Sequence, residues 1–215
     1  MNSKHYSSQG SHEQGFELSY KLAYEQLSRI SNIEEQCHKS GARYVRPNKV
    51  IIDYLNQPYH ITLPDAEISV ENSKTEVPLK DKILILHYFT LAKGTPSTGI
   101  LINYKQLPGG VSYFPAFSQR AINPFVRHFG QKPELLIDLS AKLGGHEANQ
   151  GDISVTIDAF NRVPITFALW RGDDEFPPNG GILFDANISD YLSTEDTTVL
   201  CETIVWKLVR SIPST

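Results

Sequence analysis

The densest group of charged side chains in the sequence is an acidic run between two apolar segments, Trp170-Arg171-Gly172-Asp173-Asp174-Glu175-Phe176-Pro177-Pro178. Its three adjacent carboxylates could bind a hard cation, because Ca²⁺ and Mg²⁺ take several oxygen ligands. The run also fits a solvent-exposed hairpin turn, in which water keeps the like charges apart. We favour the solvated turn, and we keep the cation or ligand role as the alternative because loops often carry function.

A second candidate lies in the glycine-rich connection that starts at Gly144 and Gly145. His146, Glu147 and Asp152 offer one imidazole and two carboxylates there. A metal site needs three or four such ligands to converge, so the remaining ones would come from elsewhere in the fold. The alternative, which we prefer, is a helix end followed by a polar loop.

The third candidate is a histidine in an apolar setting. His87 lies within the hydrophobic segment 84–91, so it faces or borders the core. We expect a core histidine with one satisfied hydrogen bond, although a buried imidazole is also what a metal or a tetrapyrrole iron would bind.

Aromatic and basic side chains gather around the turn at Pro108-Gly109-Gly110. Rings provide flat apolar walls, and arginine provides a planar fork for carboxylate or phosphate. A planar anionic ligand could bind there, whereas the preferred alternative is an aromatic cluster that seals one end of the core. The group consists of Tyr104, Lys105, Tyr113, Phe114, Phe117, Arg120, Arg127 and His128.

Several classes of protein receive no support. The chain has 215 residues and a formal net charge of -4, which disfavours nucleic acid as a partner. The sequence has no P-loop, no G-x-S-x-G elbow and no H-E-x-x-H helix. Cys37 and Cys201 are far apart and form no metal-binding or redox motif. With no signal peptide and no long apolar run, we expect a cytoplasmic protein that does not enter a membrane.

The elements that must position these residues follow from periodicity and turn residues. Residues 1–14 are polar and are interpreted as a disordered leader, followed by one domain over 15–215. The element order fits neither alternating βαβ units nor an all-β sandwich, so the predicted class is α+β, a single mixed domain with an antiparallel or mixed sheet flanked by helices. The predicted helices are 16–38, 81–92, 124–130, 135–143 and 194–210, and the predicted strands are 49–55, 59–63, 67–70, 98–105, 153–157, 163–170 and 182–184.

Three stretches together resemble a known prokaryotic family. They are His87-Tyr88 with 99–117 behind it, the strand start at Gly151-Asp152, and the segment from Pro164 through the acidic run to Leu183-Phe184-Asp185. This pattern resembles the family called domain of unknown function 3786, over about residues 20–210. The resemblance implies a soluble protein of anaerobic prokaryotes. Some members carry a cysteine-rich iron–sulfur module, which two cysteines cannot supply here.

Two functional hypotheses remain, and the first is preferred. In the first, the protein is a non-catalytic binding or accessory module for a metal-containing or other anionic small-molecule cofactor. In the second, it is a metal-assisted enzyme that uses Asp173, Asp174 and Glu175, with His87 or His146 assisting. Both require distant side chains to meet around one hollow, and neither specifies the ligand, the cofactor or the oligomeric state. The predicted ligand-binding residues are His87, Tyr88, Tyr113, Phe117, Arg120, Trp170, Asp173 and Glu175, and the predicted metal ligands are His146, Glu147 and Asp152.

Overall fold

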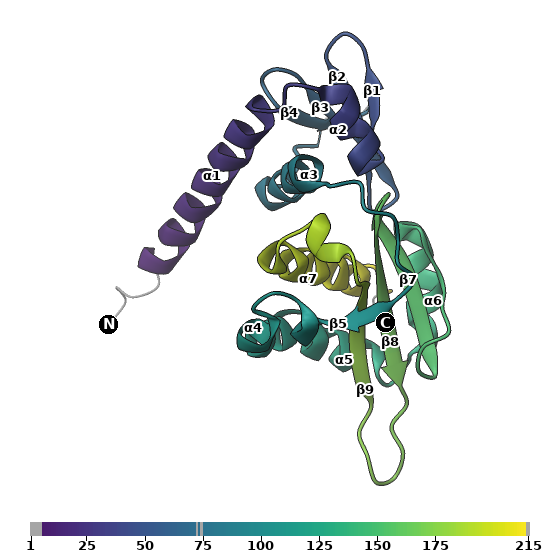
Figure 1. Cartoon of the computed structure of the whole chain (residues 1–215). Coiled ribbons are helices and arrows are strands. Elements are labelled where there is room, and N and C mark those ends of the chain that lie inside the picture. The colour runs from purple at the N-terminus through teal and green to yellow at the C-terminus, as the bar shows by residue number, and fades with distance from the viewer. Residues whose placement is uncertain (1–5, 72, 74, 214–215) are drawn as a thin grey trace.

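The computed structural model describes residues 6–71, 73 and 75–213, with the side chains described from residue 15 onward. It shows a single α+β domain around a 9-stranded antiparallel sheet, as predicted (Figure 1). The main strand order is β4-β3-β2-β7-β8-β9-β5, with β1 paired to β2 and β6 paired to β7. In chain order the strands are β1 (Arg43–Val45), β2 (Lys49–Tyr54), β3 (Gln57–Thr62), β4 (Glu67–Val70), β5 (Leu101–Asn103), β6 (Gly145–Glu147), β7 (Ile153–Phe160), β8 (Val163–Trp170) and β9 (Asn179–Asp185).

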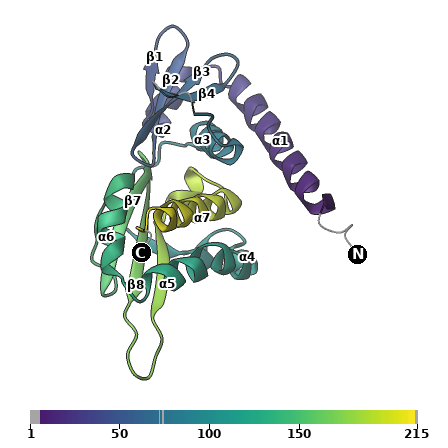
Figure 2. The ribbon, with the colours of Figure 1, turned by 180° about the vertical axis from the view of Figure 1, so that it is seen from behind.

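The helices lie on both sides of this sheet. In both views, α7 and α6 cover opposite faces of β7 and β8, and α1 projects from the body beside α3 (Figures 1 and 2). Within the described residues, no helix combines the length and the apolar character that a membrane span requires. The helices are α1 (Tyr6–Ser28), α2 (Ile33–Ser40), α3 (Leu79–Leu91), α4 (Gly110–Phe117), α5 (Asn123–Phe129), α6 (Glu134–Ser140) and α7 (Thr194–Arg210), with short 3-10 or π turns at Tyr104–Gln106, Ser118–Ile122, Ala141–Leu143 and Ile188–Asp190.

The two halves of the sheet meet at a narrow junction that aromatic rings reinforce. The β2–β7 pairing rests on the register Tyr54↔Phe160. Phe160 stacks on Tyr54 at 4.9 Å and on Tyr88 of α3 at 4.1 Å between ring centroids. All three rings are buried. Helix α3 therefore fastens both halves of the sheet to one core, because offset aromatic contacts add to the free energy of apolar burial.

Most predicted elements are confirmed, but β1 and β6 were not predicted, the strand predicted over 98–105 is limited to β5, and three further details differ. The helix predicted over 16–38 is interrupted, because the Asn32 side chain accepts a hydrogen bond from the Glu35 backbone N–H and starts α2 as a new helix. The predicted turn Asn56-Gln57 is shifted by one residue, since Leu55 and Asn56 take the positive φ values of 50° and 62° that a tight hairpin needs. The aromatic residues after Gly110 are helical and lie in α4, which the π turn then continues.

The predicted leader overlaps α1. This helix begins at Tyr6, inside the segment 1–14, and residues 1–5 lie outside the described part of the chain.

Asp185, the last residue of the Leu183-Phe184-Asp185 element, organises the loop before β5. Its carboxylate accepts hydrogen bonds from Ser97 Oγ (2.5 Å), from the backbone N–H groups of Thr98, Gly99 and Asn187 (3.0–3.1 Å), and from Thr98 Oγ1 (2.7 Å). Burial opposes ionisation, yet these donors lower the pKa of Asp185 to about 2. This aspartate therefore has a structural role in the loop.

Candidate functional site

A cavity of about 370 Å³ lies between α1, α3 and the start of α7. Its volume falls within the range of about 300–1,000 Å³ that is usual for small-molecule sites. Its walls combine apolar side chains with a few polar groups, as such sites do. The lining residues are Gly15, Phe16 and Ser19 from α1, Lys80, Ile83, Leu84 and His87 from α3, and Ser193, Glu195, Asp196 and Val199 at the start of α7.

Helical periodicity explains why α3 contributes these residues. Positions 80, 83, 84 and 87 follow the spacing i, i+3, i+4 and i+7, so they share one face of the helix. Leu86 and Phe89, which fall on another side of α3, are completely buried. One helix therefore supplies both a core surface and a wall of the cavity.

His87 is held in place by a carboxylate from a distant segment. Its Nδ1 lies 2.7 Å from Asp196 Oδ1, and the exposed fractions of the two side chains are 21% and 9%. Because an ionised carboxylate only accepts hydrogen bonds, Nδ1 carries the proton in this pair. In the neutral ring Nε2 then has the free lone pair, and no described residue forms a hydrogen bond with it.

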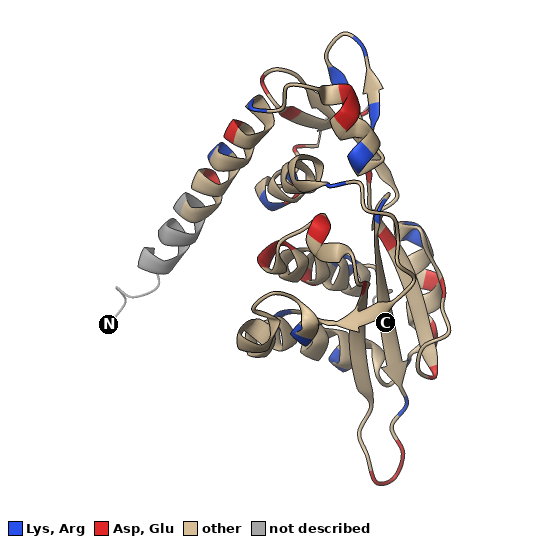
Figure 3. Ribbon diagram, viewed as in Figure 1, with Lys and Arg blue, Asp and Glu red and all other residues tan. Residues whose placement is uncertain are grey.

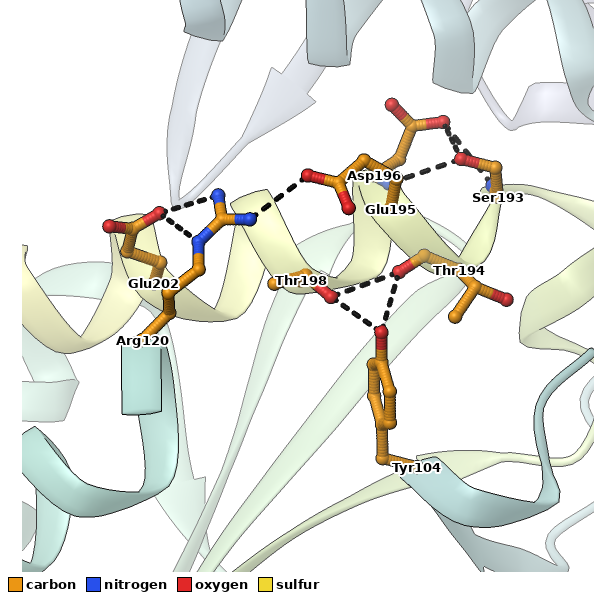
Figure 4. Close-up of polar contacts among 8 residues, drawn as sticks. All are labelled: Tyr104, Arg120, Ser193, Thr194, Glu195, Asp196, Thr198 and Glu202. Atoms are coloured by element: carbon orange, nitrogen blue, oxygen red, sulfur yellow. Dashed lines mark hydrogen bonds and ion pairs between the residues drawn. The ribbon is translucent and has the colours of Figure 1, made fainter. Parts of the chain in front are cut away.

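Asp196 also starts helix α7. Its Oδ2 accepts hydrogen bonds from Ser193 Oγ (2.6 Å) and from the Ser193 backbone N–H (3.3 Å), and its own N–H donates to Ser193 Oγ (3.1 Å), which completes a capping box (Figure 4). Burial opposes ionisation of Asp196, but the hydrogen bonds from His87 and Ser193 outweigh it and hold the pKa of Asp196 below its ordinary value. The orientation of the His87 ring therefore depends on the N-terminal end of α7.

Arg120 connects the π turn to α7 instead of lining a ligand pocket. Its Nη1 donates to Glu195 Oε1 at 3.0 Å, and its Nε and Nη2 donate to Glu202 Oε2 at 3.1 and 2.8 Å (Figure 4). Nearby, Tyr104 Oη lies 2.7 Å from Thr198 Oγ1. These contacts fix the first turns of α7, which carry Asp196.

Four other predicted ligand-binding residues have different surroundings. Tyr88 and Phe117 are completely buried core rings, stacked on Phe160 and on Tyr104. Tyr113 and Trp170 are 58% and 41% exposed and line none of the hollows described here. These four side chains do not join His87 at the α1–α3–α7 cavity.

The acidic turn lies at the tip of the β8–β9 hairpin, away from α1, α3 and α7 (Figures 1 and 3), and Arg171 beside it pairs with Glu134 of α6. It lines a separate open hollow together with residues 130, 131 and 133. Asp173 Oδ1 accepts hydrogen bonds from the Glu175 and Phe176 N–H groups at 2.9 and 2.7 Å, which lower the pKa of Asp173. His87 and Glu175 therefore line different hollows and Arg120 lines neither of them, because strand pairing carries the turn away from α1, α3 and α7.

The predicted metal ligands do not converge either. His146 and Glu147 are consecutive in β6, so their side chains leave opposite faces of the strand. Asp152 Oδ2 accepts a hydrogen bond from the Arg171 backbone N–H at 2.8 Å. Among the described residues there is no group of three His, Cys, Asp or Glu side chains that could hold a metal ion.

Sequence reasoning missed Lys80, Ser193 and Asp196 as cavity residues. Two local signals point to them: the face shared by positions 80 and 87, and the Ser-x-x-Asp spacing of a capping box. Neither signal predicts that α3 and α7 are neighbours, because that contact joins residues about a hundred positions apart.

Fold and cavity together define an α+β protein with an antiparallel sheet and a helix-lined pocket. The family model described as domain of unknown function (DUF3786) matches residues 32–207, and the chain belongs to this family. The match includes α3 and residues 194–207 of α7, but not the cavity residues of α1. No curated protein and no solved structure matches the chain. An origin in an anaerobic prokaryote stays a prediction.

Proposed function

We propose that the protein is a small-molecule-binding module whose site is the α1–α3–α7 cavity, with His87 as the main polar contact for the ligand. The observation that carries the proposal is the Asp196-held imidazole in the wall of a largely apolar cavity. A fixed ring gives a ligand a directional hydrogen-bond partner at little entropic cost.

The proposal keeps the class of function expected from the sequence but moves the site. The expected aromatic and basic wall is replaced by residues of α1, α3 and α7. The acidic turn is not part of the proposed site, because the Asp173 carboxylate already accepts hydrogen bonds from the backbone N–H groups of Glu175 and Phe176. We also propose a cytoplasmic location, which two buried free thiols support, and no nucleic acid partner, which the net charge of -4 supports.

The test uses nuclear magnetic resonance of the histidine rings in the whole chain. Hexanoate, hexylamine and hexanol are the probes, since they share an apolar chain and differ in head group. We expect at least one probe to shift the His87 ring signals in a saturable way, and binding to be lost in His87→Leu. The matched control is His146→Leu, which changes an exposed histidine outside the cavity and should retain binding.

Two results would remove the proposal. The first is that none of the probes shifts the His87 signals. The second is that His87→Leu, shown to be folded by circular dichroism, binds every probe as well as the wild type does.

The His87–Asp196 contact of 2.7 Å also favours a second candidate, an enzyme in which His87 acts as general base. Nε2 would take a proton from water as the water attacks an ester carbonyl. We expect p-nitrophenyl hexanoate to be hydrolysed above the buffer rate, with release of hexanoate and p-nitrophenol, and the excess rate to disappear in His87→Leu. An excess rate that persists in this variant would argue against the enzymatic role.

A further inference from the structure

We infer that the cavity takes an elongated anion: a carboxylate or phosphate head at Lys80, an apolar body along α3, and a hydrogen-bonding group near His87. This inference rests on the proposed binding function and adds the chemical class of the ligand. It is argued from the charges of the cavity wall and from the spacing of the residues on α3.

The two carboxylates of the wall are already engaged. Asp196 accepts hydrogen bonds from His87 and Ser193, and Glu195 is paired with Arg120 at 3.0 Å. Lys80 has no such partner: among the residues whose side chains the structure describes, none forms an ion pair with it. Lys80 is therefore the charged group of the cavity wall whose side chain is left to pair with a ligand.

The nearest acid in sequence is engaged by the sheet and not by the cavity. Asp81 is buried, and its Oδ1 accepts a hydrogen bond from Tyr54 Oη at 3.2 Å, toward the sheet. Burial raises the pKa of Asp81, and the positive charges of Lys207 and Lys80 partly oppose this shift. Asp81 is also not among the residues that line the cavity.

The spacing on α3 sets the length of the ligand. Lys80 and His87 are seven residues apart on one helix face, which is about 10 Å along the axis. Ile83 and Leu84 lie between them, and Phe16 and Val199 line the cavity from α1 and α7. A compact anion would reach only Lys80, whereas an anion with an apolar chain would contact the whole wall.

The position of Lys80 strengthens its preference for an anion. It lies in the first turn of α3, and the residue before the helix, Pro78, provides no side-chain cap. The positive end of the helix dipole therefore adds to the lysine charge at this end of the cavity.

The experiment is isothermal titration calorimetry of the whole chain with four probes: hexanoate, hexyl phosphate, hexanol and hexylamine. We expect one or both anions to bind about tenfold more tightly than hexanol, since a charge-assisted contact adds roughly that factor. The two anionic probes distinguish a carboxylate from a phosphate head. Higher salt should weaken the preference, because the interaction is electrostatic.

Lys80→Gln is the decisive variant, and Lys82→Gln is its matched control. Lys82 lies two residues away on α3 and is already paired with Glu76 at 3.6 Å, outside the cavity. We expect Lys80→Gln to lose the preference for anions while Lys82→Gln retains it. The result is read as a ratio of affinities within one variant, so a change in stability does not produce it.

The possible failures separate the two proposals. If hexanol or hexylamine binds as tightly as the anions, or if Lys82→Gln removes the preference as fully as Lys80→Gln, the anionic ligand is wrong while the cavity remains a binding site. If no probe binds and the His87 signals do not move, the proposed binding function itself fails.

Discussion

Asp196 at the cavity and Asp173 in the acidic turn are two carboxylates that receive their hydrogen bonds in different ways. Asp196 contacts His87, which is 109 residues away, and the pair is largely buried. Asp173 is satisfied by N–H groups two and three residues further along the same exposed loop. In sequence the turn is the more conspicuous cluster, but it is the cavity that joins a histidine to a carboxylate from a distant segment.

Asp185 belongs with Asp196 in this comparison. Its five donors come from the loop before β5 and from Asn187, so the carboxylate fixes one segment against another. Carboxylates of this kind should dominate the response to mutation and pH, because removing one leaves buried donors without partners.

The largest effect is expected for Asp196→Ala. The variant loses a capping box and a buried charged hydrogen bond, so we expect a loss of about 3 kcal/mol in the free energy of unfolding. Denaturant unfolding measures it, with Asp174→Ala in the exposed turn as the control that should match the wild type. If the free energy of unfolding falls equally in the two variants, the cavity carboxylate is no more important for stability than the acidic turn.

The next effect is the pH dependence that Asp185 contributes. Its pKa is about 2 in the folded protein and about 3.9 in an unfolded chain, so the folded state binds fewer protons over this range. The carboxylate therefore contributes about 2.5 kcal/mol above roughly pH 4, and this is lost as the pH falls toward 2. In Asp185→Asn the decline in stability over this interval should be shallower. An unchanged slope would show that the loop does not hold the carboxylate in its ionised form.

A smaller effect is expected at the half-exposed arginine that connects the π turn to α7. Arg120→Gln should cost about 1 kcal/mol or less, because solvent screens its pairs with Glu195 and Glu202. Thermal unfolding measures the cost, and the His87 ring signals report whether the cavity is disturbed. A loss as large as that of Asp196→Ala would mean that α7 is positioned mainly from this side.

The smallest effect is expected in the acidic turn itself. Asp173→Asn keeps a side-chain oxygen that can accept the same two backbone hydrogen bonds, so the melting temperature and hexanoate binding should match the wild type. Adding Ca²⁺ should leave the melting temperature unchanged. A rise that depends on Asp173 would restore the cation site as a function of this turn.

Much of the fold could be predicted because its signals are local. The strands at 67–70 and 163–170 and the helix at 194–210 match β4, β8 and α7, since alternation, apolar runs and capping residues act within a few positions. Helix α4 was missed because Gly109-Gly110 and Pro115 indicate a turn, whereas Gly110 opens the helix and Pro115 lies inside it.

The candidate site was predictable only in part. His87 was singled out for its apolar setting, but its partner Asp196 was not among the predicted site residues. Tyr88 and Phe117 were assigned to a ligand pocket because aromatic rings in a core and around a ligand have the same composition.

By itself, the sequence determined the α+β class and most of the elements, and it contains local signals for the helix face of Lys80 and His87 and for the capping box at Ser193, although neither was predicted. These features depend on side chains within a few residues of one another. The tertiary structure decided that Asp196 meets His87 and that the acidic turn lies away from α1, α3 and α7. Such contacts arise from the packing of the whole core, in which each helix and strand finds its neighbours through the apolar surface that they bury together.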